Sequence, residues 1–103
     1  MKDRSNLPFR LNCEGYFIDK DKNILARKEN GIIIFPGGGV AENETITEGI
    51  IRETFEETGA VISKLKELGK LNIIWELNWA RTEKQQKRYE QFQGDEMHFF
   101  SGF

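Results

Sequence analysis

Apolar and polar residues follow one another in short runs that predict several strands and one well-defined helix. The run 32–35 is continuously apolar, which predicts a buried strand. Asn30-Gly31 precedes it as a hairpin turn, and Pro36 ends it because proline donates no hydrogen bond to a sheet. The predicted strands are residues 10–18, 24–28, 32–35 and 97–103, with one or two more around Gly69 within 61–74.

The helix is predicted over residues 46–58. Thr45 followed by Glu48 fits a capping box, with Thr45 as the N-cap residue. Gly59 suits the left-handed position that often follows a helix. The pattern of residues 75–94 leaves two structures open, a strand leading into a charged loop or a short helix.

This helix carries a strip of carboxylates. With about 100° between successive residues, Glu57 lies about 40° to one side of Glu53, and Glu56 about 60° to the other. Ile51 and Phe55 fall on roughly the opposite side, so we expect them to pack on a sheet. Like charges at this spacing repel, which favours a role in binding a cation.

Composition and charge narrow the class of protein. The chain has 103 residues, a net charge of −2 and one cysteine, which predicts a single domain without an internal disulfide. The charge gives no reason to expect nucleic acid as a partner. No run has the length and apolar character of a membrane span, and the first residues lack the apolar region of a signal peptide, so we expect a cytoplasmic protein. Residues 41–60 are acidic, with six Glu and one Arg.

Three consecutive glycines, which we expect to form a loop, precede the acidic helix. Gly37, Gly38 and Gly39 have no side chains, so their backbone can approach a metal ion or a phosphate. Oxygen-only ligands favour Mg²⁺, or Mn²⁺ in its place. The sequence does not fit a P-loop, because no Gly-Lys-Ser/Thr follows, or the dinucleotide fingerprint, because Glu42 stands where the last glycine is needed.

Together these residues resemble the Nudix box, G-x5-E-x7-R-E-U-x-E-E-x-G-U, in which U is a bulky apolar residue. Thr54 and Ala60 are the departures, both at U positions. The resemblance implies an α/β fold, a Nudix-like α/β/α sandwich with a mixed sheet, formed by residues 1–103 as one domain. It also implies that the chain stops before the family's last strand and C-terminal helix. The residues that match the fixed positions are Gly38, Glu44, Arg52, Glu53, Glu56, Glu57 and Gly59.

The resemblance implies a Mg²⁺-dependent hydrolase that cleaves the pyrophosphate bond of a nucleoside diphosphate linked to another group, a nucleoside triphosphate included. Glu53, Glu56 and Glu57 would then bind the metal together with the carbonyl of Gly38 or a neighbouring glycine. By the same resemblance, Arg52 would orient a carboxylate, Glu44 would support Arg52, and Glu53 would be the base. Asp95 or Glu96 is a further candidate for ligand or base.

Several alternatives remain open. Trp75 stands where some Nudix subfamilies carry a specificity-marking Pro or Tyr, so the exact substrate is not indicated. Trp75, like Trp79, Tyr89 and Phe92, could stack on a nucleotide base, fill the core or form a homodimer contact. A catalytically silent module on the same scaffold, which binds a nucleotide or a protein, is the rival function. Isomerase chemistry on a diphosphate is a third function, without specific support. We expect His98 to be structural and Cys13 to be a small buried or half-buried side chain.

Overall fold

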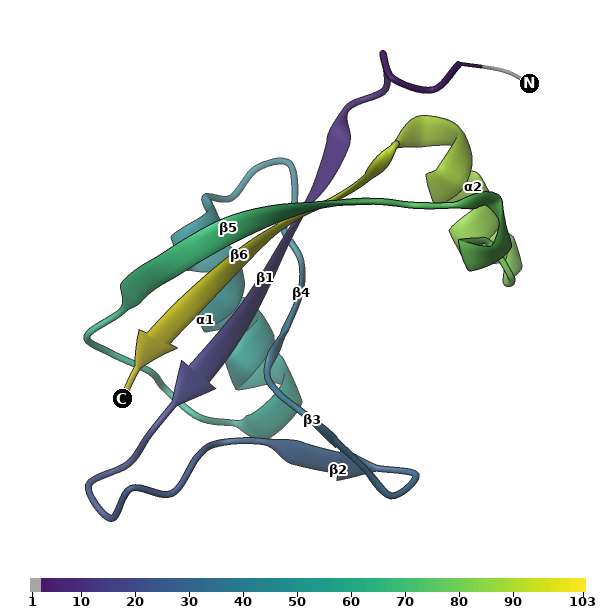
Figure 1. Cartoon of the computed structure of the whole chain (residues 1–103). Helices are drawn as coiled ribbons and strands as arrows, with labels where there is room; N and C mark the ends of the chain where they lie inside the picture. The colour runs from purple at the N-terminus through teal and green to yellow at the C-terminus, as the bar shows by residue number, and fades with distance from the viewer. Residues whose placement is uncertain (1–2) are drawn as a thin grey trace.

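A mixed four-stranded sheet forms the centre of the molecule (Figure 1). The structure is a computed structural model that describes residues 3–103. The central sheet has the strand order β4-β1-β6-β5, and a separate two-stranded sheet pairs β2 with β3. The elements are β1 (Phe9–Phe17), β2 (Arg27–Glu29), β3 (Ile32–Ile34), β4 (Gly37–Gly39), α1 (Ile46–Thr58), β5 (Lys66–Ile74), a 3-10 turn (Leu77–Trp79), α2 (Glu83–Gln91) and β6 (Gly94–Gly102).

The pairing of the strands brings distant parts of the chain together. β1 runs parallel to β6, with Cys13 opposite His98, whereas β4 pairs antiparallel with β1. β5 pairs antiparallel with β6 along its whole length, and the register shifts between Glu67 and Gly69. The sheet is therefore mixed, and of the one or two strands predicted around Gly69 the structure forms one, β5.

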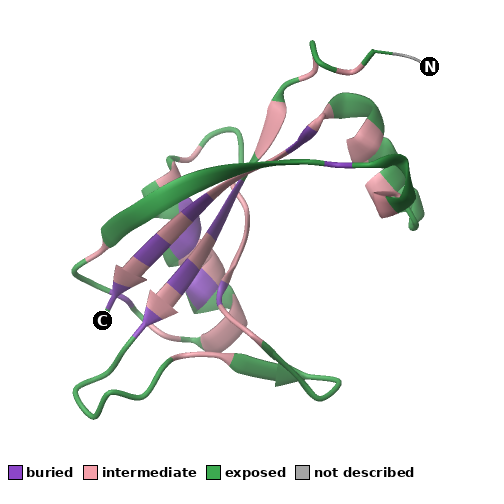
Figure 2. Cartoon of the chain, in the orientation of Figure 1, coloured by how far each residue is buried: buried purple, intermediate pink, exposed green. Residues whose placement is uncertain are grey.

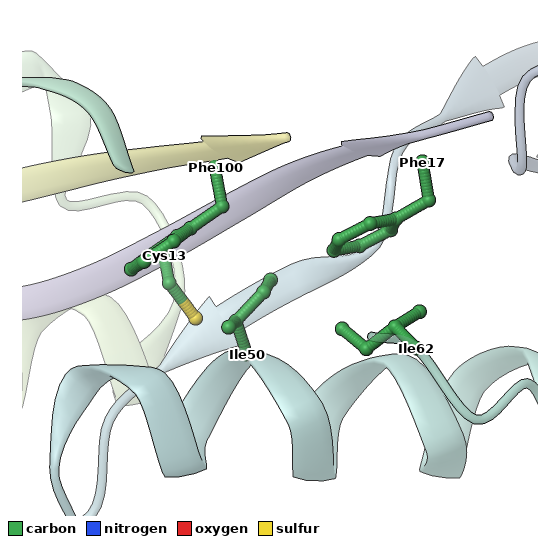
Figure 3. Close-up of a cluster of buried hydrophobic side chains, with 5 residues drawn as sticks. All are labelled: Cys13, Phe17, Ile50, Ile62 and Phe100. Carbon is green, nitrogen blue, oxygen red and sulfur yellow. The ribbon is translucent and has the colours of Figure 1, made fainter. Parts of the chain in front are cut away.

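Helix α1 covers one face of the sheet, and the core lies between them (Figure 1). Figure 3 shows Ile50 pointing from α1 toward the sheet, where it meets aromatic and small side chains of β1 and β6. Cys13 is 1% exposed, as predicted for a buried cysteine. Burying an aliphatic side chain fully stabilises a fold by about 1.5–3 kcal/mol. The buried cluster consists of Cys13, Phe17, Ile50, Ile62 and Phe100.

The prediction that Ile51 and Phe55 pack on the sheet is wrong. These side chains are 40% and 56% exposed, whereas Ile50 and Thr54 are fully buried. Ile50 lies about 60° and Thr54 about 100° from Glu53 around the helix axis. The buried face of α1 therefore borders the carboxylate strip instead of lying opposite to it, and this places Glu53 beside the sheet. The hydroxyl of Thr54 donates to the Ile50 carbonyl at 2.7 Å, which satisfies the polar group in the core.

Two further expectations are corrected. Ile32 and Ile33 are 64% and 66% exposed, so β3 is not buried; it pairs only with β2 in a hairpin outside the central sheet (Figure 2). The glycines 37–39 form the edge strand β4 and not a loop, because their backbone pairs with β1. The hairpin turn at Asn30-Gly31 is confirmed by positive φ angles of 51° and 79°.

The ambiguous segment 75–94 contains a short helix. Thr82 caps α2 through a capping box with Gln85, and the 3-10 turn precedes it. The N-terminal segment packs against this helix, because the Arg4 guanidinium donates to the carbonyls of Tyr89 and Phe92, at 2.5 Å each. Within residues 3–103, no helix is long and apolar enough to cross a membrane.

Candidate metal centre

The start and the end of α1 are fixed by local hydrogen bonds. The Thr45 hydroxyl accepts from the Glu48 backbone N–H at 3.1 Å, and the Glu48 carboxylate accepts from the Thr45 N–H at 2.9 Å. Gly59 follows the helix with φ of 76°, in the left-handed region that favours glycine. The predicted capping box and the helix bounds are confirmed, so the register of the carboxylates along α1 is set by the sequence.

Arg52 lies at the centre of a group of carboxylates. Its Nη2 and Nε lie 2.7 and 3.0 Å from the two carboxylate oxygens of Glu44, in a forked contact. Nη1 donates to Glu56 at 3.0 Å, and Nη2 lies 3.2 Å from Glu53. Nη2 also donates to the carbonyl of Gly39 at 3.2 Å. Arg52 therefore ties the helix both to the segment before it and to the glycine strand.

The same contacts shift the acidity of Glu44. Hydrogen bonds from Arg52, and then from the Ala41 backbone N–H, lower the pKa of Glu44 to about 2. Glu44 is therefore ionised at neutral pH. It gives Arg52 a permanent charged partner, so the guanidinium has a defined position next to Glu53 and Glu56.

Glu53 and Glu57 lie where α1 meets the sheet. Their side chains are only 18% and 16% exposed. Burial raises the pKa of Glu57, and the adjacent Glu53 carboxyl raises it further, whereas the Gly37 backbone N–H lowers it. Arg27 of β2 is 3.5 Å from Glu57. Two adjacent, half-buried carboxylates are costly unless a proton or a cation lies between them.

The glycine strand leaves room for this pair. A Cβ atom on Gly38 would lie 2.9 Å from Cδ and Oε1 of Glu53, too close for ordinary packing. The Gly38 carbonyl accepts a hydrogen bond from the Cys13 thiol at 3.5 Å. The glycine strand and the two carboxylates thus lie together where the sheet meets the helix, with Glu53 over Gly38 and the Gly37 N–H at Glu57.

The donor set fits a hard divalent cation, since all of these ligand atoms are oxygens. Across residues 3–103, however, no three His, Cys, Asp or Glu side chains are arranged as a ready-made set of metal ligands. Glu56 explains this, because it is held by Arg52 and its side chain is 57% exposed. A metal bound by Glu53 and Glu57 would gain Glu56 as a ligand by a rotation of that exposed side chain.

The two candidates outside α1 have other partners. Asp95 accepts hydrogen bonds from Asn12 at 2.5 Å and from the Trp75 indole at 2.9 Å, and burial raises its pKa. Glu96 accepts from His98, with the two atoms 2.6 Å apart. Trp75 is 5% exposed and stacks on Trp79 with ring centroids 3.7 Å apart, so its ring is part of a packed pair.

The sequence did not reveal Arg10. Its guanidinium lies over Gly39, where a Cβ atom would be 2.8 Å from Cζ of Arg10. Arg10 is 29 positions before Gly39, and only the pairing of β1 with β4 brings the two together. No local motif around Arg10 could have indicated this contact.

Comparison with known proteins identifies the family of the chain. The family model described as NUDIX domain matches residues 15–101, and the chain therefore belongs to the Nudix family. A segment of 53 residues, 52% of the chain, is 38% identical to Nudix hydrolase 3 of Caenorhabditis elegans. That segment is 22% of the worm protein.

Solved structures show the same fold. A NUDIX hydrolase from Nitrosomonas europaea superposes with a TM-score of 0.62 at 17% identity, over 91% of this chain and 57% of that one. The MutT protein from Methanosarcina mazei Go1 gives a TM-score of 0.60 at 24% identity, over 95% of this chain and 65% of that one. The chain thus spans less than two thirds of the length of these relatives. The predicted α/β fold with a mixed sheet is confirmed.

Proposed function

We propose that this protein is a Mg²⁺-dependent hydrolase that cleaves the pyrophosphate bond of a nucleoside diphosphate derivative, nucleoside triphosphates included. One observation carries the proposal. Glu53 lies over Gly38 and against Glu57, while Arg52, itself fixed by Glu44, contacts Glu53 and Glu56. This arrangement concentrates negative charge next to a strand without side chains, which suits a dication shared with phosphate oxygens.

The residues have distinct roles in this mechanism. Mg²⁺, when bound, would neutralise phosphate charge and lower the pKa of a nearby water molecule. Glu53, Glu56, Glu57 and the Gly38 carbonyl would hold it. The backbone of residues 37–39 lets the diphosphate approach closely. Glu53 accepts the proton of the attacking water as the new oxygen–phosphorus bond forms and the bridging phosphorus–oxygen bond breaks.

Arg52 acts as a positioning residue. Its guanidinium contacts three carboxylates at once, so it fixes their spacing in the absence of metal. Glu56 would leave this contact to become a ligand of a bound dication, while the forked contact with Glu44 would keep Arg52 in place.

The test is a panel of nucleotides with Mg²⁺, with release of a nucleoside monophosphate as the readout. We expect the double variant Glu56→Gln and Glu57→Gln to lose at least about a hundredfold in turnover, because it lacks two charged ligands. Glu83→Gln with Glu90→Gln is the matched control, since it removes the same charge from exposed positions of α2.

Two results would reject the proposal. Wild-type turnover that persists in excess chelator would exclude the metal-dependent mechanism. Saturable nucleotide binding without any product would instead favour the silent binding module.

A further inference from the structure

Arg10 and Arg88, called here the arginine pair, lie at the end of the sheet where β1 and β6 begin. Arg10 is the second residue of β1 and pairs in register with Asp95 of β6. Arg88 is in the last turn of α2. Both side chains are half-buried.

The arginine pair lacks charged partners at close range. Among residues 3–103, no carboxylate lies within 4.0 Å of either guanidinium, whereas Arg52 has three such partners. Arg10 makes one side-chain hydrogen bond, a long one of 3.4 Å to the Asn12 side chain. No buried nitrogen in the described chain is left without a partner, so the remaining donors of Arg10 reach solvent. These donors are open to a ligand.

The two guanidiniums also repel each other. Burial lowers the pKa of Arg10 and the charge of Arg88 lowers it further, while Asp95 and Glu53 raise it. The negative charge of Asp95 interacts with both arginines, but its carboxylate already accepts hydrogen bonds from Asn12 and Trp75. Two half-buried cations near one occupied carboxylate leave a net positive charge, which an anionic oxygen would balance.

The glycine strand β4 lies between the Arg10 guanidinium and the Glu53 carboxylate of α1. Side chains of alternate strand residues point to opposite faces, so Arg10 lies on the face of β1 away from the core residue Cys13. The Glu53 carboxylate lies over Gly38 and the Arg10 guanidinium over Gly39. β4 is the edge strand of the sheet, so a ligand can reach around it from one group to the other.

We propose that the arginine pair binds a phosphate group of the substrate, next to the one attacked at the metal centre. This inference rests on the proposed function and makes it more specific. The guanidinium of Arg10 presents forked donors to phosphate oxygens, and Arg88 adds a second charge from α2. The arginine pair would then select substrates by the number and placement of their phosphates.

The test is a calorimetric titration with inorganic pyrophosphate in the presence of Mg²⁺. We expect Arg10→Gln and Arg88→Gln each to raise Kd about tenfold, the effect of losing one charged hydrogen bond. Arg10→Lys keeps the charge but loses the fork, so it should recover part of the affinity. Lys87→Gln is the matched control and should change Kd less than about twofold, because this neighbouring side chain is 74% exposed.

The kinetics separate a binding role from a structural one. If wild type hydrolyses a nucleotide, we expect Arg88→Gln to raise KM with kcat largely kept, and the thermal midpoint to stay near that of wild type. Should Arg10→Gln fail to fold, Arg88→Gln alone decides, because it lies on a helix surface. Wild-type Kd for pyrophosphate in both arginine variants, or no pyrophosphate binding by wild type, would overturn the inference.

The two proposals fail in different ways. If no nucleotide is hydrolysed but pyrophosphate binding depends on both arginines, the proposed function fails and the anion site stands. If nucleotides are hydrolysed with equal KM in wild type and arginine variants, only the arginine pair is rejected.

Discussion

Two charged clusters in this molecule are similar in residue composition but differ in net charge. The Arg52 cluster consists of Arg52 and four carboxylates, those of Glu44, Glu53, Glu56 and Glu57. The His98 cluster consists of His98 between Glu67 and Glu96, with each ring nitrogen 2.6 Å from a carboxylate oxygen. Both clusters place a cationic group between acids.

The difference lies in the charge that remains. Four carboxylates and Arg52 sum to a formal charge of −3 in the Arg52 cluster, and Arg27 of β2, 3.5 Å from Glu57, reduces the excess to −2. When the imidazole is protonated, the two carboxylates leave a formal charge of −1 in the His98 cluster. One of these carboxylates, that of Glu67, belongs to a side chain that is 50% exposed. The first cluster needs a further cation, whereas the second is nearly balanced and links β5 to β6. An uncompensated negative charge where a helix packs on a sheet therefore indicates a cation-binding site better than the number of acidic residues does.

The largest expected effect follows from this contrast. Arg52→Gln should lower metal-dependent turnover by about a hundredfold, because three carboxylates lose their common partner and their orientation. His98→Gln should change turnover less than about threefold, since the His98 cluster lies outside the metal centre. Initial rates on the best nucleotide of the panel measure both. Equal losses in the two variants would show that the clusters do not have separate roles.

The second prediction concerns the packing that keeps the Arg52 cluster beside the sheet. Ile50→Ala should lower the free energy of unfolding by about 2–5 kcal/mol, because it leaves a cavity in the core. Ile51→Ala, its neighbour on the exposed side of α1, should cost less than about 1 kcal/mol. Urea denaturation of both variants provides the comparison. A cost for Ile51→Ala as large as that for Ile50→Ala would contradict the helix orientation described above.

The smallest effect is the pH dependence of the His98 cluster. Burial disfavours the charged imidazole, but Glu96 and Glu67 outweigh it, and the pKa of His98 is raised. Since the folded pKa exceeds the unfolded value of about 6.5, the stabilisation is complete below that value. It is lost as the pH rises through the folded pKa. The thermal midpoint should therefore fall over this range in wild type, and less in His98→Gln; identical slopes would reject the role of His98.

Much of the Arg52 cluster could be predicted from the sequence because its parts are local. Thr45, Glu48 and Gly59 fix the two ends of α1 through hydrogen bonds and backbone geometry within a few residues. Helical geometry then sets the angles between the carboxylates. The face of α1 that meets the sheet could not be predicted in the same way, because Ile51 and Phe55 are as apolar as Ile50 and only the sheet decides which is buried.

The sequence by itself determined the helix, its caps, the spacing of its acids and the family to which the chain belongs, because each depends on contacts within one turn or on residues in fixed order. Tertiary structure alone decided that residues 37–39 become an edge strand, that Glu53 lies over Gly38, and that Arg10 lies over Gly39. These contacts join segments up to 29 positions apart, and strand pairing between such segments depends on the packing of the whole sheet.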